Sequence, residues 1–152
     1  MVILGYHVIF TTYGTWLPND PRGSYSKTIY QKELRAWGEI KYGRQNPQPS
    51  REIMKKFWKS TELHLPRPSF FLNDTTRNTV ALAFGVVVKR LNLKIPTCAI
   101  MNDHIHLLVL PSKYKIEYIV NQLKGAAAHY IESNPPRAGL PLQKWDIVEK
   151  LL

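Results

Sequence analysis

The chain has 152 residues, of which 44% are hydrophobic and 21% are charged, enough for one compact domain around a single core. Its 21 Lys and Arg against 11 Asp and Glu leave a formal charge of +10, which favours a polyanionic partner. The single cysteine, Cys98, excludes an internal disulfide and a cysteine-rich zinc site. No stretch approaches the ~20 apolar residues of a membrane span, so we expect a soluble, cytoplasmic protein without a membrane partner.

The first half of the chain predicts one strand and a basic segment. Residues 6–13 are rich in β-branched and aromatic side chains, which is typical of a strand. Residues 22–60 hold ten Lys or Arg and three acids, a local charge of +7, and we expect two short helices there, at 30–40 and 51–59. The sequence therefore predicts a basic helical insertion.

Aromatic residues are interleaved with these cations, as in a surface that neutralises phosphates and stacks on unpaired bases. The alternative is a solvated basic insertion whose aromatic residues anchor it to the core. If the segment binds nucleic acid, the candidate contacts are the basic residues Arg22, Lys27, Arg35, Lys55, Lys56 and Lys59.

The second half predicts two helices and two strands. A helix over 76–91, capped by Asn73 or Asp74, has an apolar stripe, and Gly85 within it would permit close packing on a sheet. Strands follow at 94–101 and 104–110, and a second helix at 116–133. The stripe of the first helix consists of Val80, Phe84, Val87, Val88 and Leu91.

The order strand, helix, strand, strand, helix is that of an α+β, ferredoxin-like (RRM-like) fold, in which an antiparallel sheet carries helices on one face. The final strand of that fold is missing from the predicted elements. The strand at 104–110 is apolar on both faces apart from its histidines, so we expect it to be central and buried.

Two histidines begin this strand. His104 and His106 project from the same side, with Cα atoms roughly 6.6 Å apart, so they can converge on one metal ion. The alternative is a pair of polar residues at a strand end, satisfied by backbone or water. Burying two imidazoles without partners in an apolar strand would be costly, which favours the metal site.

Further site residues must come from elsewhere in the chain. Tyr130 and Asn134 stand at i and i+4 on the last helix, so their hydroxyl and amide oxygen would approach the sheet together. Each has an ordinary alternative, since Tyr130 could be an aromatic residue at the edge of the core and Asn134 a helix stop before proline.

Four segments of the chain carry further information: MNDHIHLLVLP with its His-hydrophobic-His strand, YIESNPPRAGL with its tyrosine helix, QLKGAA, and the amino-terminal YHVIFTTYGTWLPNDPRG. Together these segments resemble one family, the REP-associated tyrosine group of the single-tyrosine HUH transposases. Compared with that family, the chain is shortened before the tyrosine helix, because QLKGAAAHYIESNPP joins two helices directly.

The resemblance implies that His104, His106 and Asn134 bind a divalent cation and that Tyr130 is the nucleophile. Nitrogen ligands suit manganese and magnesium is abundant in cells, so we expect either Mg²⁺ or Mn²⁺ to serve. Such proteins bind a DNA hairpin, cut a neighbouring single strand and hold its 5′ end as a phosphotyrosine before rejoining it.

The sequence therefore predicts a metal-dependent, DNA-nicking and strand-joining transposase, associated with the nucleoid when bound to DNA. Two alternatives stay open: a catalytically inactive remnant of the fold that only binds nucleic acid, and a metal-dependent nuclease that uses water as nucleophile. Pairing of two copies into a homodimer also stays open.

Overall fold

The computed structural model describes residues 2–30 and 32–133, and the chain divides into two compact units. One unit comprises Met1–Phe10 with Leu72–Leu152, and the other is Thr11–Phe71. The expectation of a single core is wrong, because Thr11–Phe71 has a hydrophobic cluster of its own around Leu34. The predicted basic insertion 22–60 lies inside this second unit.

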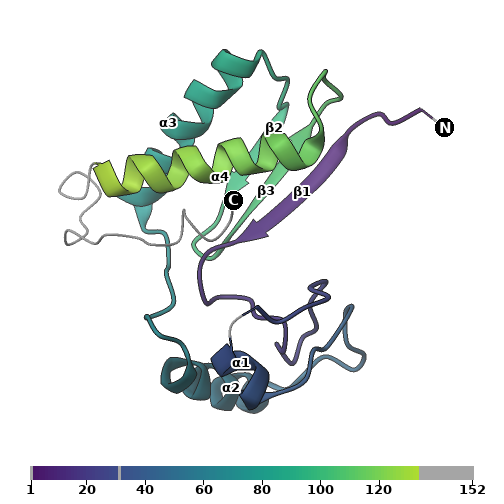
Figure 1. Cartoon of the computed structure of the whole chain (residues 1–152), viewed down its shortest axis with the longest axis vertical. Coiled ribbons are helices and arrows are strands. Elements are labelled where there is room, and N and C mark those ends of the chain that lie inside the picture. Colours follow the sequence, from purple (N-terminus) through teal and green to yellow (C-terminus); the bar gives the residue numbers. More distant parts are fainter. Residues whose placement is uncertain (1, 31, 134–152) are drawn as a thin grey trace. The chain divides into compact units, whose positions relative to one another are not determined.

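The first unit is built on a three-stranded sheet in the order β1-β3-β2 (Figure 1). Strand β1 spans Tyr6–Thr11, β2 spans Thr97–Ile100 and β3 spans His104–Val109, so β3 is central as expected. Strands β2 and β3 pair antiparallel, with Ala99 opposite His106. Strands β1 and β2 are shorter than predicted, and Pro96 immediately before β2 cannot donate a hydrogen bond to a ladder.

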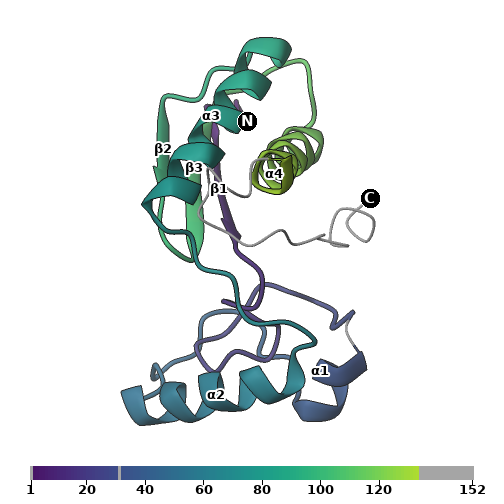
Figure 2. The ribbon, with the colours of Figure 1, turned by 90° about the vertical axis from the view of Figure 1, so that its left-hand side faces the viewer.

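Two helices cover one face of the sheet, α3 (Asp74–Leu91) and α4 (Ile116–Ser133), and they pack against each other (Figure 2). The ring of Phe10 on β1 lies edge-on to that of Phe84 on α3, with centroids 6.1 Å apart. This arrangement confirms the predicted α+β, ferredoxin-like architecture with both helices on the same face. In residues 2–30 and 32–133 the sheet has three strands.

Strand β3 is buried on one face only. Ile105, Leu107 and Val109 are buried, whereas His104 and His106 are partly exposed and Leu108 retains 38% of its surface. Because side chains alternate along a strand, the apolar set faces the helices and the histidines face the other way. The prediction of a strand buried on both faces is wrong, since within the described residues of this unit both helices pack on the same side.

Helix α3 follows its predicted pattern. The Asn73 side chain caps it by accepting a hydrogen bond from the Thr76 backbone N–H at 2.9 Å, and Asn92 ends it in the left-handed conformation at φ 50°. The apolar stripe is confirmed, with Val88 only partly buried and the other four members buried: Val80, Phe84, Val87 and Leu91.

Gly85 does not contact the sheet. It is exposed on α3, and a Cβ added there would meet nothing within 4 Å. The expectation that it permits close packing is wrong, because Ala83, Phe84 and Val87 occupy the buried side of the helix.

Helix α4 has the predicted bounds, 116–133, and buries Ile119, Leu123 and Ile131. Lys124 extends from α4 over the Phe10 ring of β1, with its Nζ 5.2 Å from the ring centroid. Burial lowers the pKa of this lysine, because desolvation penalises its charged form. Helix α4 thus covers the same sheet face as α3.

The second unit contains α1 (Lys32–Trp37) and α2 (Arg51–His64). Helix α1 ends at Trp37, before the predicted residue 40, and it is followed directly by Gly38, a poor helix former. Helix α2 extends past the predicted residue 59, since its buried face continues through Thr61. The Trp37 ring stacks on both Phe57 and His64, with centroids 4.9 Å away in each case. In the described part of the chain, no helix has the length and apolar character needed to cross a membrane.

We predict that Gly85→Ala stabilises the protein by about 0.5–1 kcal/mol. Alanine reduces the backbone entropy of the unfolded chain, and the open space around the position in α3 accommodates its methyl group. Urea unfolding measures the change. The matched variant Gly23→Ala should be strongly destabilising, since φ is +94° and the new Cβ would stand 1.8 Å from the Gly43 carbonyl oxygen. Destabilisation by Gly85→Ala would contradict the open placement.

Candidate functional site

The two predicted histidines lie together on the sheet face opposite α3 and α4. The ring centroids of His104 and His106 are 4.8 Å apart and their planes cross at 76°. Both side chains are partly exposed, so solvent reaches the pair. The same-side placement predicted from strand alternation is observed, but the two imidazoles are not enclosed in an apolar environment.

A carboxylate orients the first of these rings. The Nδ1 atom of His104 is 2.6 Å from Oδ1 of Asp103, its neighbour in sequence. An N–H at Nδ1 that donates to this carboxylate leaves the Nε2 lone pair of His104 exposed to a ligand.

A third histidine was missed in the sequence analysis. His7 on β1 approaches the central strand, and its Nε2 is 3.1 Å from Nδ1 of His106. The two rings are nearly parallel, at 15°, with centroids 5.3 Å apart. A lone histidine within an apolar strand was the only available signal, and its partner is 99 positions away, so only the pairing of β1 with β3 shows the contact.

The predicted nucleophile does not join this cluster within one chain. Tyr130 is partly buried on α4, the helix that covers the other face of the sheet, and its ring lies 6.2 Å from that of His129. The structure therefore brings His104 and His106 together and separates them from Tyr130 by the sheet. The other predicted ligand, Asn134, lies outside the described residues.

The donor set fits part of a metal site. Within residues 2–30 and 32–133, no group of three or more His, Cys, Asp or Glu side chains is arranged to hold a metal ion. His104 and His106 are nevertheless two adjacent nitrogen donors on an open face, each with a polar partner at Nδ1. This chemistry suits a cation that takes its remaining ligands from other groups.

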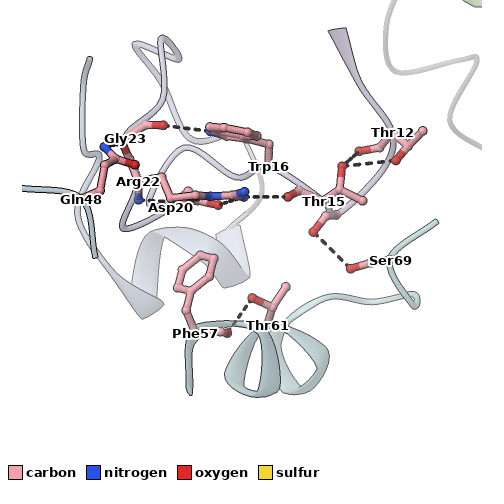
Figure 3. Close-up of polar contacts among 11 residues, drawn as sticks. Thr12, Thr15, Trp16, Asp20, Arg22, Gly23, Gln48, Phe57, Thr61 and Ser69 are labelled. Atoms are coloured by element: carbon pink, nitrogen blue, oxygen red, sulfur yellow. Dashed lines mark hydrogen bonds and ion pairs between the residues drawn. The ribbon is translucent and has the colours of Figure 1, made fainter. Parts of the chain in front are cut away.

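In the second unit, Arg22 is held by the protein itself. It makes a two-pronged ion pair with the fully buried Asp20, with Nε–Oδ1 and Nη2–Oδ2 distances of 2.9 and 2.7 Å (Figure 3). Its guanidinium also lies 3.8 Å from the centroid of the Trp16 ring, and its Nη2 donates to the Thr15 carbonyl oxygen. These contacts give Arg22 a structural role, whatever it contributes to DNA binding.

The other predicted DNA contacts are exposed. Arg35 is exposed although its Nε donates to the Ile29 carbonyl oxygen at 2.5 Å. On α2, basic residues at i, i+1 and i+4 project on the side away from the buried Met54 and Thr61. Trp58, 46% exposed, stands next to them. The exposed lysines are Lys27, Lys55, Lys56 and Lys59.

A family model described as "Transposase IS200 like" matches residues 66–142, just over half of the chain. The chain belongs to the IS200-like transposase family. Membership of this family indicates DNA transposition as the function, DNA cleavage as the general activity and DNA as the partner. No curated protein and no solved structure matches the chain.

The part shared with IS200-like transposases includes α3, the histidine strand β3 and α4 with Tyr130. Strand β1, with His7, and the basic segment 22–60 precede it. The histidine pair and Tyr130 are therefore features of the transposase segment, whereas the ring that contacts His106 comes from outside it.

We predict that Asp20→Ala destabilises the protein by about 2–4 kcal/mol, because it leaves the Arg22 guanidinium and the Arg22 backbone N–H without their acceptor. Urea unfolding measures the loss. The control Glu62→Ala removes an exposed carboxylate from α2 and should change stability by no more than about 0.5 kcal/mol. Equal effects of the two substitutions would contradict a structural role for the Asp20–Arg22 pair.

Proposed function

We propose that this chain is a divalent-metal-dependent transposase of the REP-associated, single-tyrosine HUH type, which cuts single-stranded DNA beside a hairpin and rejoins it through a phosphotyrosine. The observation that carries the proposal is the pair of adjacent imidazoles on the open face of β3, inside the segment that matches IS200-like transposases. The sequence motifs around His104, His106 and Tyr130 support the finer assignment.

His104, His106 and Asn134 would hold the cation, either Mg²⁺ or Mn²⁺. A cation there would act as a Lewis acid toward a non-bridging oxygen of the scissile phosphate. The protein side chains hold the site in position: Asp103 orients the His104 ring, and His104 and His106 are both partly exposed.

Tyr130 supplies the nucleophile in this proposal. Its phenol oxygen attacks the phosphorus, a bond from Oη to phosphorus forms, and the bond to the 3′ oxygen breaks. The phenol proton is lost and the departing 3′ oxygen gains one, so the products are a 5′-phosphotyrosine and a free 3′ hydroxyl. Attack by another 3′ hydroxyl reverses these steps and joins the strands. The phosphodiester is exchanged rather than hydrolysed, so no external energy source is needed.

The position of α4 supports a proposal in which two copies cooperate. Tyr130 belongs to the helix that covers the opposite sheet face from His104 and His106, so its phenol is screened from the histidines of its own chain. We therefore propose a homodimer in which Tyr130 of one copy serves the histidine pair of the other. Two such sites are equivalent by two-fold symmetry.

Exposed cations of the basic segment would supply much of the DNA affinity. Lys55, Lys56 and Lys59 form a compact group on α2 beside the exposed Trp58 ring. Lysines neutralise phosphates, and an exposed indole can stack on an unpaired base. A single strand flanking a hairpin offers both features.

The two-copy arrangement predicts complementation between inactive variants. Tyr130→Phe and His106→Ala should each form no covalent adduct with a labelled hairpin oligonucleotide in Mn²⁺. Mixed in equal amounts under conditions that exchange subunits, they should recover about a quarter of the wild-type sites, since half of the dimers are mixed and each contains one complete site. Denaturing gels that retain the protein–DNA adduct provide the measurement.

A mixture no better than its components, with an active wild type, would overturn the exchange of Tyr130 between copies. An adduct as abundant in Tyr130→Phe as in the wild type would overturn the phosphotyrosine itself. Cleavage that survives Tyr130→Phe without any adduct would indicate water as the nucleophile.

For the basic segment, replacing Lys55, Lys56 and Lys59 together by Gln should weaken binding of hairpin DNA with a single-stranded flank. If each lysine contacts one phosphate of that flank, the slope of log K against log [salt] should become shallower by about 2. Fluorescence anisotropy over a salt series gives the slope. The control Lys89→Gln, at an exposed lysine on α3 outside the basic segment, should leave the slope nearly unchanged. An unchanged slope in the triple variant would place the DNA elsewhere.

A second candidate function is DNA binding without cleavage by a remnant of the transposase. The placement of Tyr130 on the helix away from the histidines favours it. It predicts salt-dependent binding that is indifferent to His104→Ala and Tyr130→Phe, with no adduct in the wild type or in any mixture.

A further inference from the structure

We infer that His7 is a positioning residue that sets the tautomer of His106, so that His106 presents its Nε2 lone pair as a metal ligand. This inference rests on the proposed metal site. It adds to that site a residue from β1, a strand that precedes the segment matching the transposase family.

The argument starts from the proton count of a neutral imidazole, which has one N–H and one lone pair. Nδ1 of His106 faces Nε2 of His7 at 3.1 Å, so one of these nitrogens holds the proton and the other accepts it. If His106 donates from Nδ1, its Nε2 is free to bind a cation. If His7 donates instead, Nε2 of His106 holds the proton and cannot bind one.

The first arrangement requires neutral His7 to be protonated at Nδ1 and to offer its Nε2 lone pair. His7 is exposed on β1, so its Nδ1–H can be satisfied by water. Its Nε2 is occupied by the contact with His106, and no group of three metal-ligating side chains is found across residues 2–30 and 32–133. His7 therefore supports a ligand and is not a third ligand itself.

His104 is oriented in a chemically different way. Its Nδ1 is 2.6 Å from the carboxylate of Asp103, which lies in the connection between β2 and β3. The two proposed ligands thus share one arrangement, an Nδ1–H donated to an acceptor and an Nε2 left for the cation. For His104 the acceptor is adjacent in sequence, whereas for His106 it comes from the neighbouring strand β1.

Mn²⁺ affinity of the full chain, measured by isothermal titration calorimetry without DNA, tests this role. His7→Leu removes the acceptor and should weaken Mn²⁺ binding by about 10- to 100-fold. His7→Gln retains an oxygen that can accept from Nδ1 of His106 and should stay within a few-fold of the wild type. His129→Gln removes an exposed histidine from α4 and should have no effect.

The tautomer of His106 in the metal-free wild type provides a second measurement, which does not depend on metal binding. Long-range ¹H–¹⁵N NMR spectra at a pH where the rings are neutral distinguish the two imidazole tautomers. We expect His106 to be protonated at Nδ1, and His7→Leu to shift it toward the Nε2–H form. A wild-type His106 protonated at Nε2 would overturn the inference.

The remaining outcomes separate this inference from the proposed function. Wild-type protein that binds no Mn²⁺ would overturn the metal site itself. Wild-type binding that His7→Leu leaves unchanged would overturn only the role of His7. Equal weakening by His7→Gln and His7→Leu would show that a hydrogen-bond acceptor is not what His7 provides.

Discussion

The two-residue repeat of β3 is the constraint on which the site depends. Ile105, Leu107 and Val109 must face α3 and α4 to bury their apolar surface, so His104 and His106 can only face the other way. A one-residue slip in register would expose the apolar set and bury both imidazoles, at the cost of losing core packing and desolvating two polar rings. Core packing thus determines on which sheet face the two histidines lie.

The same constraint is the physical reason for proposing that two copies share the chemistry. The sheet that orients the histidines also separates them from α4, and α4 is held in place by Ile119 and Leu123 in the core. Moving Tyr130 to the histidine face of its own chain would require removing this helix from the sheet. A second copy can bring the phenol to the histidines without that loss of packing.

The second unit maintains its own structure by different means. Its core cluster is small, and the buried Asp20, the Arg22 guanidinium and the Trp16 ring form a polar centre that organises the loops before α1. The buried Asp20 carboxylate needs a positively charged partner, and this need accounts for Arg22, which the sequence analysis had suggested as a DNA contact. The lysines of α2 are exposed on the helix, so no buried partner accounts for their charge.

The sequence by itself determined the local features: the bounds of α4, the stripe and cap of α3, the same-side placement of His104 and His106, and the basic character of residues 22–60. These depend on periodicity and on neighbours within a few positions. Tertiary structure alone decided that His7 contacts His106 and that Tyr130 lies across the sheet from the histidines. The pairing of strands and the side on which a helix packs depend on contacts between distant residues, which no local pattern encodes.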